Sequence, residues 1–153
     1  MQKISTCLWF DGQAEEAARF YCSVFRNSKI RQTVLYGDTG PGPKGSVMTV
    51  HFELDRHEFL ALNAGPMFKF NHAISLMVNC ETQKELDEMW TRLSVGGATE
   101  QCGWLRDKYG LSWQVVPAIL ADLLKDPAKS DKVMQAVIKM TKLDIATMRK
   151  AAS

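Results

Sequence analysis

The stretch DKYGLSWQVVP, Asp107–Pro117, is typical of a turn that leads into a strand with a sharp end. Aspartate and glycine favour the turn, and the aromatic and β-branched residues that follow favour a pleated, half-buried strand. Pro117 has no backbone N–H to offer a sheet, so we expect the strand to end there. Side chains alternate along a strand, so Gln114 shares a face with Ser112 while Trp113 faces the other way. Gln114 is therefore a polar side chain in the middle of an apolar strand.

Length and composition are those of one globular domain. The chain has 153 residues, 46% hydrophobic and 24% charged, and its net charge of +2 is too small to indicate a nucleic acid or an anionic membrane as partner. No apolar run approaches the roughly 18 residues that span a bilayer, and the N-terminus does not resemble a signal peptide. We therefore expect a cytoplasmic protein.

The four cysteines, Cys7, Cys22, Cys80 and Cys102, form no C-x-x-C pair. Widely spaced cysteines without such pairs are more typical of reduced packing residues than of a zinc or redox site. Cys7 and Cys102 are alternative nucleophiles, but no histidine or helix terminus that would lower a thiol pKa is visible beside either. We expect packing roles.

The first half of the chain has the order strand, helix, strand, strand, strand. Apolar residues recur at helical spacing between Ala14 and Phe25, and Glu15 and Glu16 fall where the helix dipole favours negative charge. The glycine- and proline-rich segment Gly37–Gly45 predicts a mobile surface loop. We expect the helix at Gln13–Arg26, a hairpin turn at Asp55–Glu58, and strands at Lys3–Phe10, Ser28–Tyr36, Ser46–Leu54 and Phe59–Asn63.

The same pattern begins again after a linker at Met67–His72. Thr82 and Glu85 have the spacing of a capping box, and the apolar stripe that follows ends at Gly96-Gly97. Sliding the first half onto the second, with Thr6 on Ser75, superimposes strand on strand and helix on helix, which indicates an internal duplication. We expect strands at Ala73–Asn79, Ala98–Trp104 (one strand or two short ones) and Leu111–Val116.

These observations predict an α+β fold made of two tandem βαβββ modules, at about residues 1–66 and 67–117, in a single domain with a helical tail at 118–153. The tail is expected to contain helices that cap the sheet or pack on a second copy of the chain. We place these helices at Ala118–Leu124, Ser130–Met140 and Leu143–Ala151.

Tandem βαβββ modules resemble the vicinal oxygen chelate (VOC) superfamily, which includes the glyoxalases, extradiol dioxygenases and fosfomycin-resistance proteins. Within it the chain resembles the PhnB-like branch, often catalogued as 3-demethylubiquinone-9 3-methyltransferase-like. The matching stretches are LWFDGQAEEAARFYCSVF (8–25), SKI (28–30), KGSVMTVHFELD (44–55), FLALNAGPMFKFNHAISLMVNCETQKELDEMW (59–90), LSVGGATEQCGWLRDKYGLSWQVVP (93–117) and the helical tail. The resemblance implies curved sheets around a cavity, in a homodimer that can exchange modules between chains.

Neither methyl transfer nor a tightly held metal is expected. A Rossmann-type methyltransferase needs a glycine-rich turn after its first strand, and Asp11-Gly12-Gln13-Ala14 is not such a turn. Metal-dependent relatives place His or Glu at positions that fall, within one residue of register, near Thr6, Leu62, Ser75 and Gln114. Hydroxyl, isobutyl and amide groups are poor ligands beside imidazole and carboxylate. No cofactor is expected.

The resemblance and the residues together suggest a polar, uncharged site for an unknown small molecule. Thr6, Ser75 and Gln114 would form its floor, and Trp9 and Trp104 would be walls, although aromatics at such positions are more often core. The alternative is a lyase, isomerase or resistance enzyme in which His51 and Glu53, on one strand face, act as acid and base or as metal ligands. We favour a solvated polar face for that pair. In a third reading, the protein's own aromatics fill the cavity.

Overall fold

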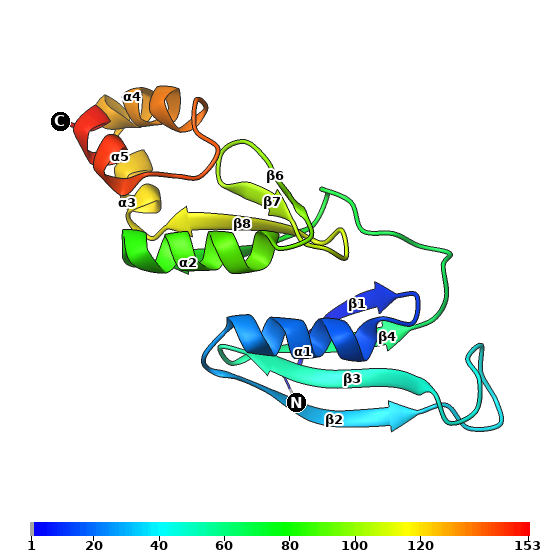
Figure 1. Ribbon diagram of the computed structural model, residues 1–153. Helices are drawn as coiled ribbons and strands as arrows, with labels where there is room; N and C mark the ends of the chain where they lie inside the picture. The colour runs from blue at the N-terminus through cyan, green and yellow to red at the C-terminus, as the bar shows by residue number, and fades with distance from the viewer. Residues whose placement is uncertain (1) are drawn as a thin grey trace. The chain divides into compact units, whose positions relative to one another are not determined.

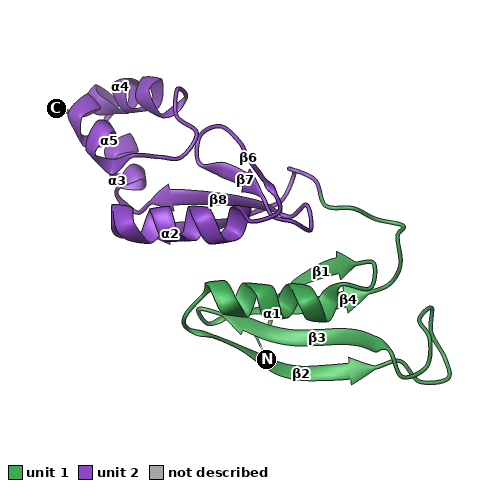
Figure 2. Cartoon of the chain, viewed as in Figure 1, with its two compact units in different colours: residues 1–70 green, residues 71–153 purple. Residues whose placement is uncertain are grey.

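The computed structural model describes residues 2–153, which form two compact units that divide after Phe70 (Figures 1 and 2). Each unit contains one four-stranded sheet, and the two sheets have the same topology. The predicted α+β fold with two βαβββ repeats and a helical C-terminal tail is therefore confirmed. Among the described residues, no helix is long and apolar enough to cross a membrane.

The first unit is a mixed sheet in the order β1-β4-β3-β2, with α1 on one face (Figure 1). β1 runs parallel to β4, and the other neighbours are antiparallel. Its buried core joins Ala17, Ala18 and Tyr21 of α1 to Phe52 and Phe59 of the sheet. The elements are β1 (Thr6–Phe10), α1 (Ala14–Val24), β2 (Ser28–Leu35), β3 (Val47–Leu54) and β4 (His57–Asn63).

The second unit repeats this arrangement in the order β5-β8-β7-β6, again with the first strand parallel to the last. Thr82 caps α2 by accepting a hydrogen bond from the Glu85 N–H at 3.2 Å, as predicted. The predicted stripe, Leu86, Met89, Trp90 and Leu93, is the buried side of α2. The elements are β5 (Ser75–Cys80), α2 (Gln83–Ser94), β6 (Ala98–Thr99), β7 (Trp104–Arg106) and β8 (Ser112–Pro117).

The turn before β8 is organised by a buried carboxylate. Asp107, 3% exposed, accepts hydrogen bonds from the backbone N–H groups of Tyr109 and Leu111 and from the indole N–H of Trp113. Gly110 completes the turn at φ 86°, a conformation that side chains with a Cβ rarely adopt. β8 ends at Pro117, as the sequence predicted.

The C-terminal tail consists of α3 (Ile119–Lys125), α4 (Pro127–Val137) and α5 (Ile145–Ala151). Its buried apolar residues are Val133, Val137, Leu143 and Met148. The side chain of Gln83 on α2 donates to the Leu143 carbonyl at 3.1 Å and accepts from the Ile145 N–H at 2.8 Å. The tail is thus fastened to the helix of its own unit.

Several predicted boundaries differ from the structure. His57 and Glu58 belong to β4, because the hairpin turn is completed by Asp55 and Arg56, which have φ of 44° and 68°. The segment Ala98–Trp104 contains the two-residue strand β6 and the start of β7, separated where Cys102 adopts φ 60°. β1 begins at Thr6 rather than Lys3, and α4 begins at Pro127, where the first helical turn needs no N–H donor.

Candidate functional site

The face of the second sheet opposite α2 carries a set of polar side chains, and we call it the second open face. The helix-covered face is marked by the buried residues Leu105, Trp113 and Val115. Alternation along β8 places Ser112 and Gln114 on the opposite side. Paired residues share a face, so the register completes two rows across the open face: Arg106, Ser112 and Ser75, then Trp104, Gln114 and Met77.

Gln114 and Ser75 lie together on this face. The Gln114 Nε2 donates to the Ser75 Oγ at 2.9 Å, across the parallel pair β5 and β8. Both residues are half-buried, and so is Trp104, which pairs directly with Gln114. The bond leaves the amide oxygen of Gln114 and the proton of the Ser75 hydroxyl able to contact a bound molecule.

A charged group lies at the edge of the second open face. The Glu100 Oε2 is 2.7 Å from the His72 Nε2 and 3.7 Å from the Arg106 Nε. The His72 ring is 6.4 Å from the Trp104 ring. Arg106, Ser112 and the pair of His72 and Glu100 were not identified as site residues from the sequence. The pairing register of a strand as short as β7, with three residues, cannot be predicted from its sequence.

The open face of the first sheet, which we call the first open face, has a different character. The alternation of β1 and β4 places Cys7, Trp9, Leu60 and Leu62 on it, while Leu8 and Phe10 are buried on the other side. Trp9 is held by a hydrogen bond from its indole N–H to the Gly65 carbonyl at 2.8 Å and by an edge contact with Phe68.

Thr6 does not lie on the first open face. Its register partner is Phe59, a core residue, and its Oγ1 is 3.0 Å from the Nε2 of His57. Cys7 takes the open-face position instead, because a shift of one residue along a strand reverses the face. Of the three predicted floor residues, the structure therefore joins Ser75 to Gln114 and places Thr6 on the helix-bearing side of the first sheet.

His51 and Glu53 both lie on the first open face, and both are half-buried. The Glu53 carboxylate accepts from Nε and Nη2 of Arg31, and this guanidinium lowers the pKa of Glu53. A carboxylate with a lowered pKa is a weak base and is rarely protonated near neutral pH. Acid–base catalysis would need a carboxyl group that gains and loses a proton near neutral pH. Glu53, bound to Arg31, is not such a group.

Three of the four cysteines, Cys7, Cys22 and Cys80, have thiols that their surroundings do not activate. Burial raises the pKa of Cys7 and of Cys22, and burial with the nearby Glu85 and Glu81 carboxylates raises the pKa of Cys80 to about 12. All four cysteines are free. A raised pKa keeps a thiol protonated. Cys80 is buried, as a packing role requires, whereas Cys7 is exposed, so the packing role predicted for Cys7 is not supported.

The residues at the superfamily's metal positions do not fit a tightly held divalent ion. Ser75 and Gln114 present a hydroxyl and an amide, and Leu62 presents an isobutyl group. Within residues 2–153, no three or more His, Cys, Asp or Glu side chains are grouped as a metal site would require. Uncharged oxygen donors are poor substitutes for imidazole and carboxylate.

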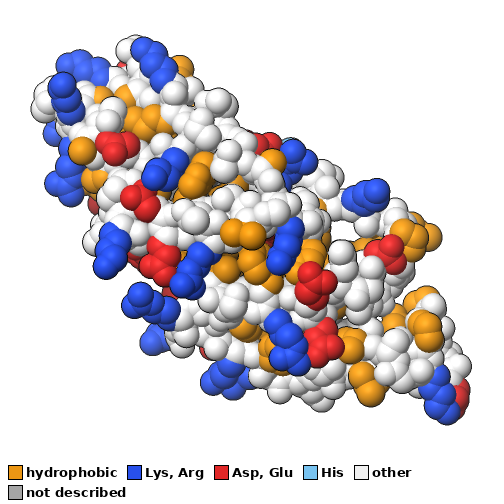
Figure 3. Space-filling view, viewed as in Figure 1, with side chains coloured by type: hydrophobic (Ala, Val, Ile, Leu, Met, Phe, Trp, Pro, Cys, Tyr) orange, Lys and Arg blue, Asp and Glu red, His pale blue; other side chains and the backbone are white. Residues whose placement is uncertain are grey.

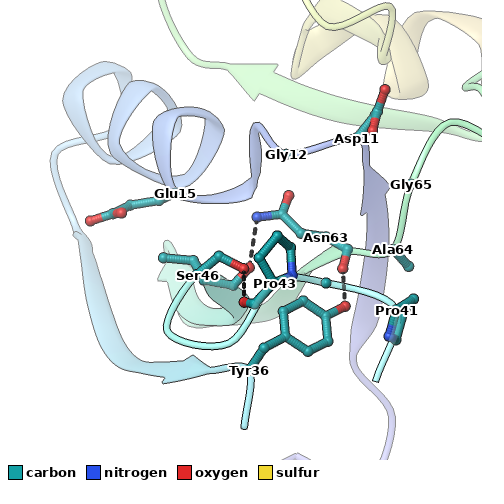
Figure 4. A pocket seen from close by; sticks show the side chains of 12 residues that line it. Asp11, Gly12, Glu15, Tyr36, Pro41, Pro43, Ser46, Asn63, Ala64 and Gly65 are labelled. Atoms are coloured by element: carbon teal, nitrogen blue, oxygen red, sulfur yellow. Dashed lines mark hydrogen bonds between the residues drawn. The ribbon is translucent and has the colours of Figure 1, made fainter. Parts of the chain in front are cut away.

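A separate hollow of about 360 Å³ opens in the first unit beside the glycine- and proline-rich loop (Figure 4). The loop wraps over the buried ring of Tyr36, whose hydroxyl donates to the Asn63 carbonyl. The Asn63 amide in turn donates to the Val47 carbonyl and accepts from the Ala14 N–H. The polar groups of the wall form hydrogen bonds with one another. They therefore serve the structure of the first unit and do not by themselves indicate a binding site. The loop contains no regular element, as predicted, but its base is anchored.

The chain is similar to proteins of one family. The sequence pattern of the family described as 3-demethylubiquinone-9 3-methyltransferase matches residues 2–116. A PhnB protein from Bacillus cereus is 40% identical, with a TM-score of 0.70 over 76% of this chain and 100% of its own. No curated protein matches the sequence.

Two more distant structures share the fold. A protein from Pseudomonas aeruginosa is 20% identical, with a TM-score of 0.64 over 76% of this chain and 98% of its own. The fosfomycin-resistance protein FosX from Mesorhizobium loti is 12% identical, with a TM-score of 0.57 over 82% of this chain and 100% of its own. The family match and the similarity to the Bacillus cereus protein lead to one conclusion: the chain belongs to the PhnB-like, 3-demethylubiquinone-9 3-methyltransferase-like family.

Proposed function

We propose that this protein binds a small organic molecule on the second open face, with no tightly held metal or other cofactor, as a cytoplasmic homodimer. The observation that carries the proposal is the hydrogen bond from Gln114 to Ser75, beside the half-buried ring of Trp104. A few polar groups beside an aromatic wall are typical of small-molecule sites. Gln114 and Ser75 would orient the ligand, and Trp104 would cover its apolar part.

A homodimer, with or without exchange of modules, would cover the apolar side chains that each unit leaves open to solvent. Met77 is 57% exposed on the second open face, and Phe68 is 59% exposed beside Trp9. Exposed apolar side chains of this size are the kind that a partner surface covers. Charges of both signs are interspersed over the surface seen in Figure 3, which offers no single-sign field for a nucleic acid.

Methyl transfer is not part of the proposal. Both sheets are mixed, with only their first and last strands parallel, whereas Rossmann-type cofactor sites require a parallel sheet and a glycine-rich turn. The alternative function, a lyase, isomerase or resistance enzyme, relies on His51 and Glu53. The ion pair between Arg31 and Glu53 argues against it.

A thermal-shift screen of metabolites and antibiotics tests the binding proposal, because a ligand that binds only the folded chain raises its melting temperature. A hit should stabilise the wild type and the control Gln135→Leu, an exposed glutamine on α4. It should lose most of its effect on Gln114→Leu and Trp104→Ala. Hits that stabilise all four proteins equally would contradict the proposed location.

Metal analysis separates the two functions. We expect less than stoichiometric metal in the purified protein and no change in melting temperature on adding EDTA. Stoichiometric metal that disappears in His51→Ala or Glu53→Ala would support the enzyme instead. Sedimentation at several concentrations tests the homodimer, and a monomer throughout would contradict it.

A further inference from the structure

We infer that the ligand of the second open face is an organic oxyanion, a carboxylate or a phosphonate, whose charged group lies over the row formed by Arg106, Ser112 and Ser75. This inference rests on the proposed function and adds the chemical class of the ligand. It depends on three observations about that row: the pairing register of its strands, the weak contacts of the Arg106 guanidinium and the hydrogen bonding of the two serine hydroxyls.

The register brings three hydrogen-bond donors side by side. Ser112 pairs with Arg106 on one side and with Ser75 on the other, so the three side chains leave the sheet on the same face from three adjacent strands. Directly paired residues in a sheet have Cβ atoms about 5 Å apart. An oxyanion that accepts one hydrogen bond of about 2.8 Å from each of two such donors bridges this distance, and the long side chain of Arg106 can reach the same group.

The guanidinium of Arg106 is weakly engaged. Its contact across residues 2–153 is the 3.7 Å approach of Nε to the Glu100 Oε2, and the same oxygen lies 2.7 Å from His72. The side chain of Arg106 is 46% exposed. Its two Nη groups therefore remain available, and a guanidinium fork matches a carboxylate or a phosphonate in two parallel hydrogen bonds.

The hydroxyl groups supply the remaining donors. The Oγ of Ser112 is buried and has no hydrogen-bond partner, which is unusual because a buried polar atom without a partner is destabilising. Ser75 accepts from Gln114, so its own proton is free to be donated. An anion beside these groups would provide the missing acceptor for both hydroxyls.

The next row indicates the rest of the ligand. Trp104, Gln114 and Met77 follow on the same face, and Met77 is 57% exposed. An aromatic ring and a thioether are suited to an apolar body, and Gln114 adds one hydrogen bond. The expected ligand is therefore a small acid with an apolar part, rather than an inorganic ion.

The test compares an anion with its neutral isostere on the ¹⁵N-labelled full chain. Benzoate and benzamide are titrated, with phenylphosphonate as a second oxyanion, and the side-chain signals of Trp104 and Gln114 are followed by NMR. Charge-assisted hydrogen bonds predict that benzoate binds about tenfold or more tightly than benzamide. Comparing benzoate with phenylphosphonate identifies which oxyanion is preferred.

Three variants make the test specific. Arg106→Gln should reduce the preference for benzoate over benzamide to near unity, whereas the control Arg92→Gln, on the exposed side of α2, should retain it. Ser112→Ala should weaken benzoate binding several-fold without lowering the stability of the free protein, because it removes an unpartnered hydroxyl.

Each outcome bears on one proposal or on both. If benzoate and benzamide shift the Trp104 and Gln114 signals with equal affinity, the oxyanion inference is overturned and the proposed function stands. A preference that survives in Arg106→Gln also overturns the inference. If no probe at millimolar concentration moves these signals, the oxyanion inference fails, and the proposed function is then decided by the thermal-shift screen alone.

Discussion

The indole N–H of Trp113 donates a hydrogen bond to the Oδ2 of Asp107 at 2.9 Å, and both side chains are almost fully buried. The other carboxylate oxygen, Oδ1, accepts from the N–H groups of Tyr109 and Leu111 at 2.9 and 3.1 Å. One carboxylate therefore fixes the turn, the start of β8 and the orientation of a core tryptophan. Gln114 is the next residue, so this network also positions the candidate site.

Asp107→Asn should be strongly destabilising. The amide oxygen of asparagine can still accept from the two backbone N–H groups, but its NH₂ group would then meet the indole N–H of Trp113, donor against donor. We expect a loss of about 1–3 kcal/mol in urea unfolding, the range for a buried donor that loses its acceptor. Asp122→Asn, on the exposed surface of α3, is the control and should change stability little. Equal effects of the two substitutions would contradict the role of Asp107.

Gly42→Ala should destabilise the first unit. A Cβ on Gly42 would overlap the buried ring of Tyr36, and moving the ring disturbs its hydroxyl bond to the Asn63 carbonyl. Overpacking of this kind costs about 1–3 kcal/mol. Gly37→Ala, in the same loop, has no atom within 4 Å of its new Cβ and should be neutral or slightly stabilising. Thermal unfolding of the two variants in parallel decides the matter, and a harmless Gly42→Ala would show that the loop does not pack on Tyr36.

Arg31→Gln should raise the pKa of Glu53 toward its ordinary value, because the arginine is the largest cause of its lowering. The folded-state pKa is depressed, so this pair stabilises the fold above the ordinary glutamate pKa of about 4.3. The stabilisation is lost as the pH falls through the lower folded-state pKa. NMR titration of the carboxyl group measures the shift. Lys29→Gln, which removes a more remote charge, should raise the pKa less.

Gln83→Ala should loosen the C-terminal tail. It removes the bonds to the Leu143 carbonyl and from the Ile145 N–H, together worth about 2 kcal/mol at a typical 1 kcal/mol each. It also removes a bond from Gln83 to Asp87 within α2. Hydrogen exchange should accelerate at the amides of α5 while the exchange of β3 and β4 stays unchanged. Gln135→Ala, an exposed glutamine that bonds Asp131 within α4, is the matched control. Unaltered exchange in α5 would mean that its apolar residues alone hold the tail.

Most of the architecture could be predicted from local patterns. The alternation of Val50, Phe52 and Leu54, the helical stripe ending at Leu93 and the stop at Pro117 are each encoded in adjacent residues. The repeated order of strand and helix then gave the duplicated topology. These signals are strong because burial on one face imposes a periodicity that the sequence displays directly.

The candidate site was less predictable because it depends on register. Thr6 and Cys7 are adjacent in the sequence but face opposite sides of the sheet, and landmarks accurate to one residue could not choose between them. Arg106 reaches the second open face only through pairings of a three-residue strand. The sequence pattern places Tyr36 at the end of a strand but does not predict that its ring packs against Gly40 and Gly42 of the loop that follows.

The two sheets have the same strand order, but different kinds of side chain lie on their two open faces. One presents Leu60 and Leu62 beside a thiol, and the other presents Gln114 and Ser75 beside a guanidinium. A duplicated unit begins with two identical surfaces, so the residues on the open faces of this chain have changed since the duplication. A side chain of one face placed on the equivalent strand of the other sheet would therefore meet different neighbours, so the two faces are not interchangeable in chemistry.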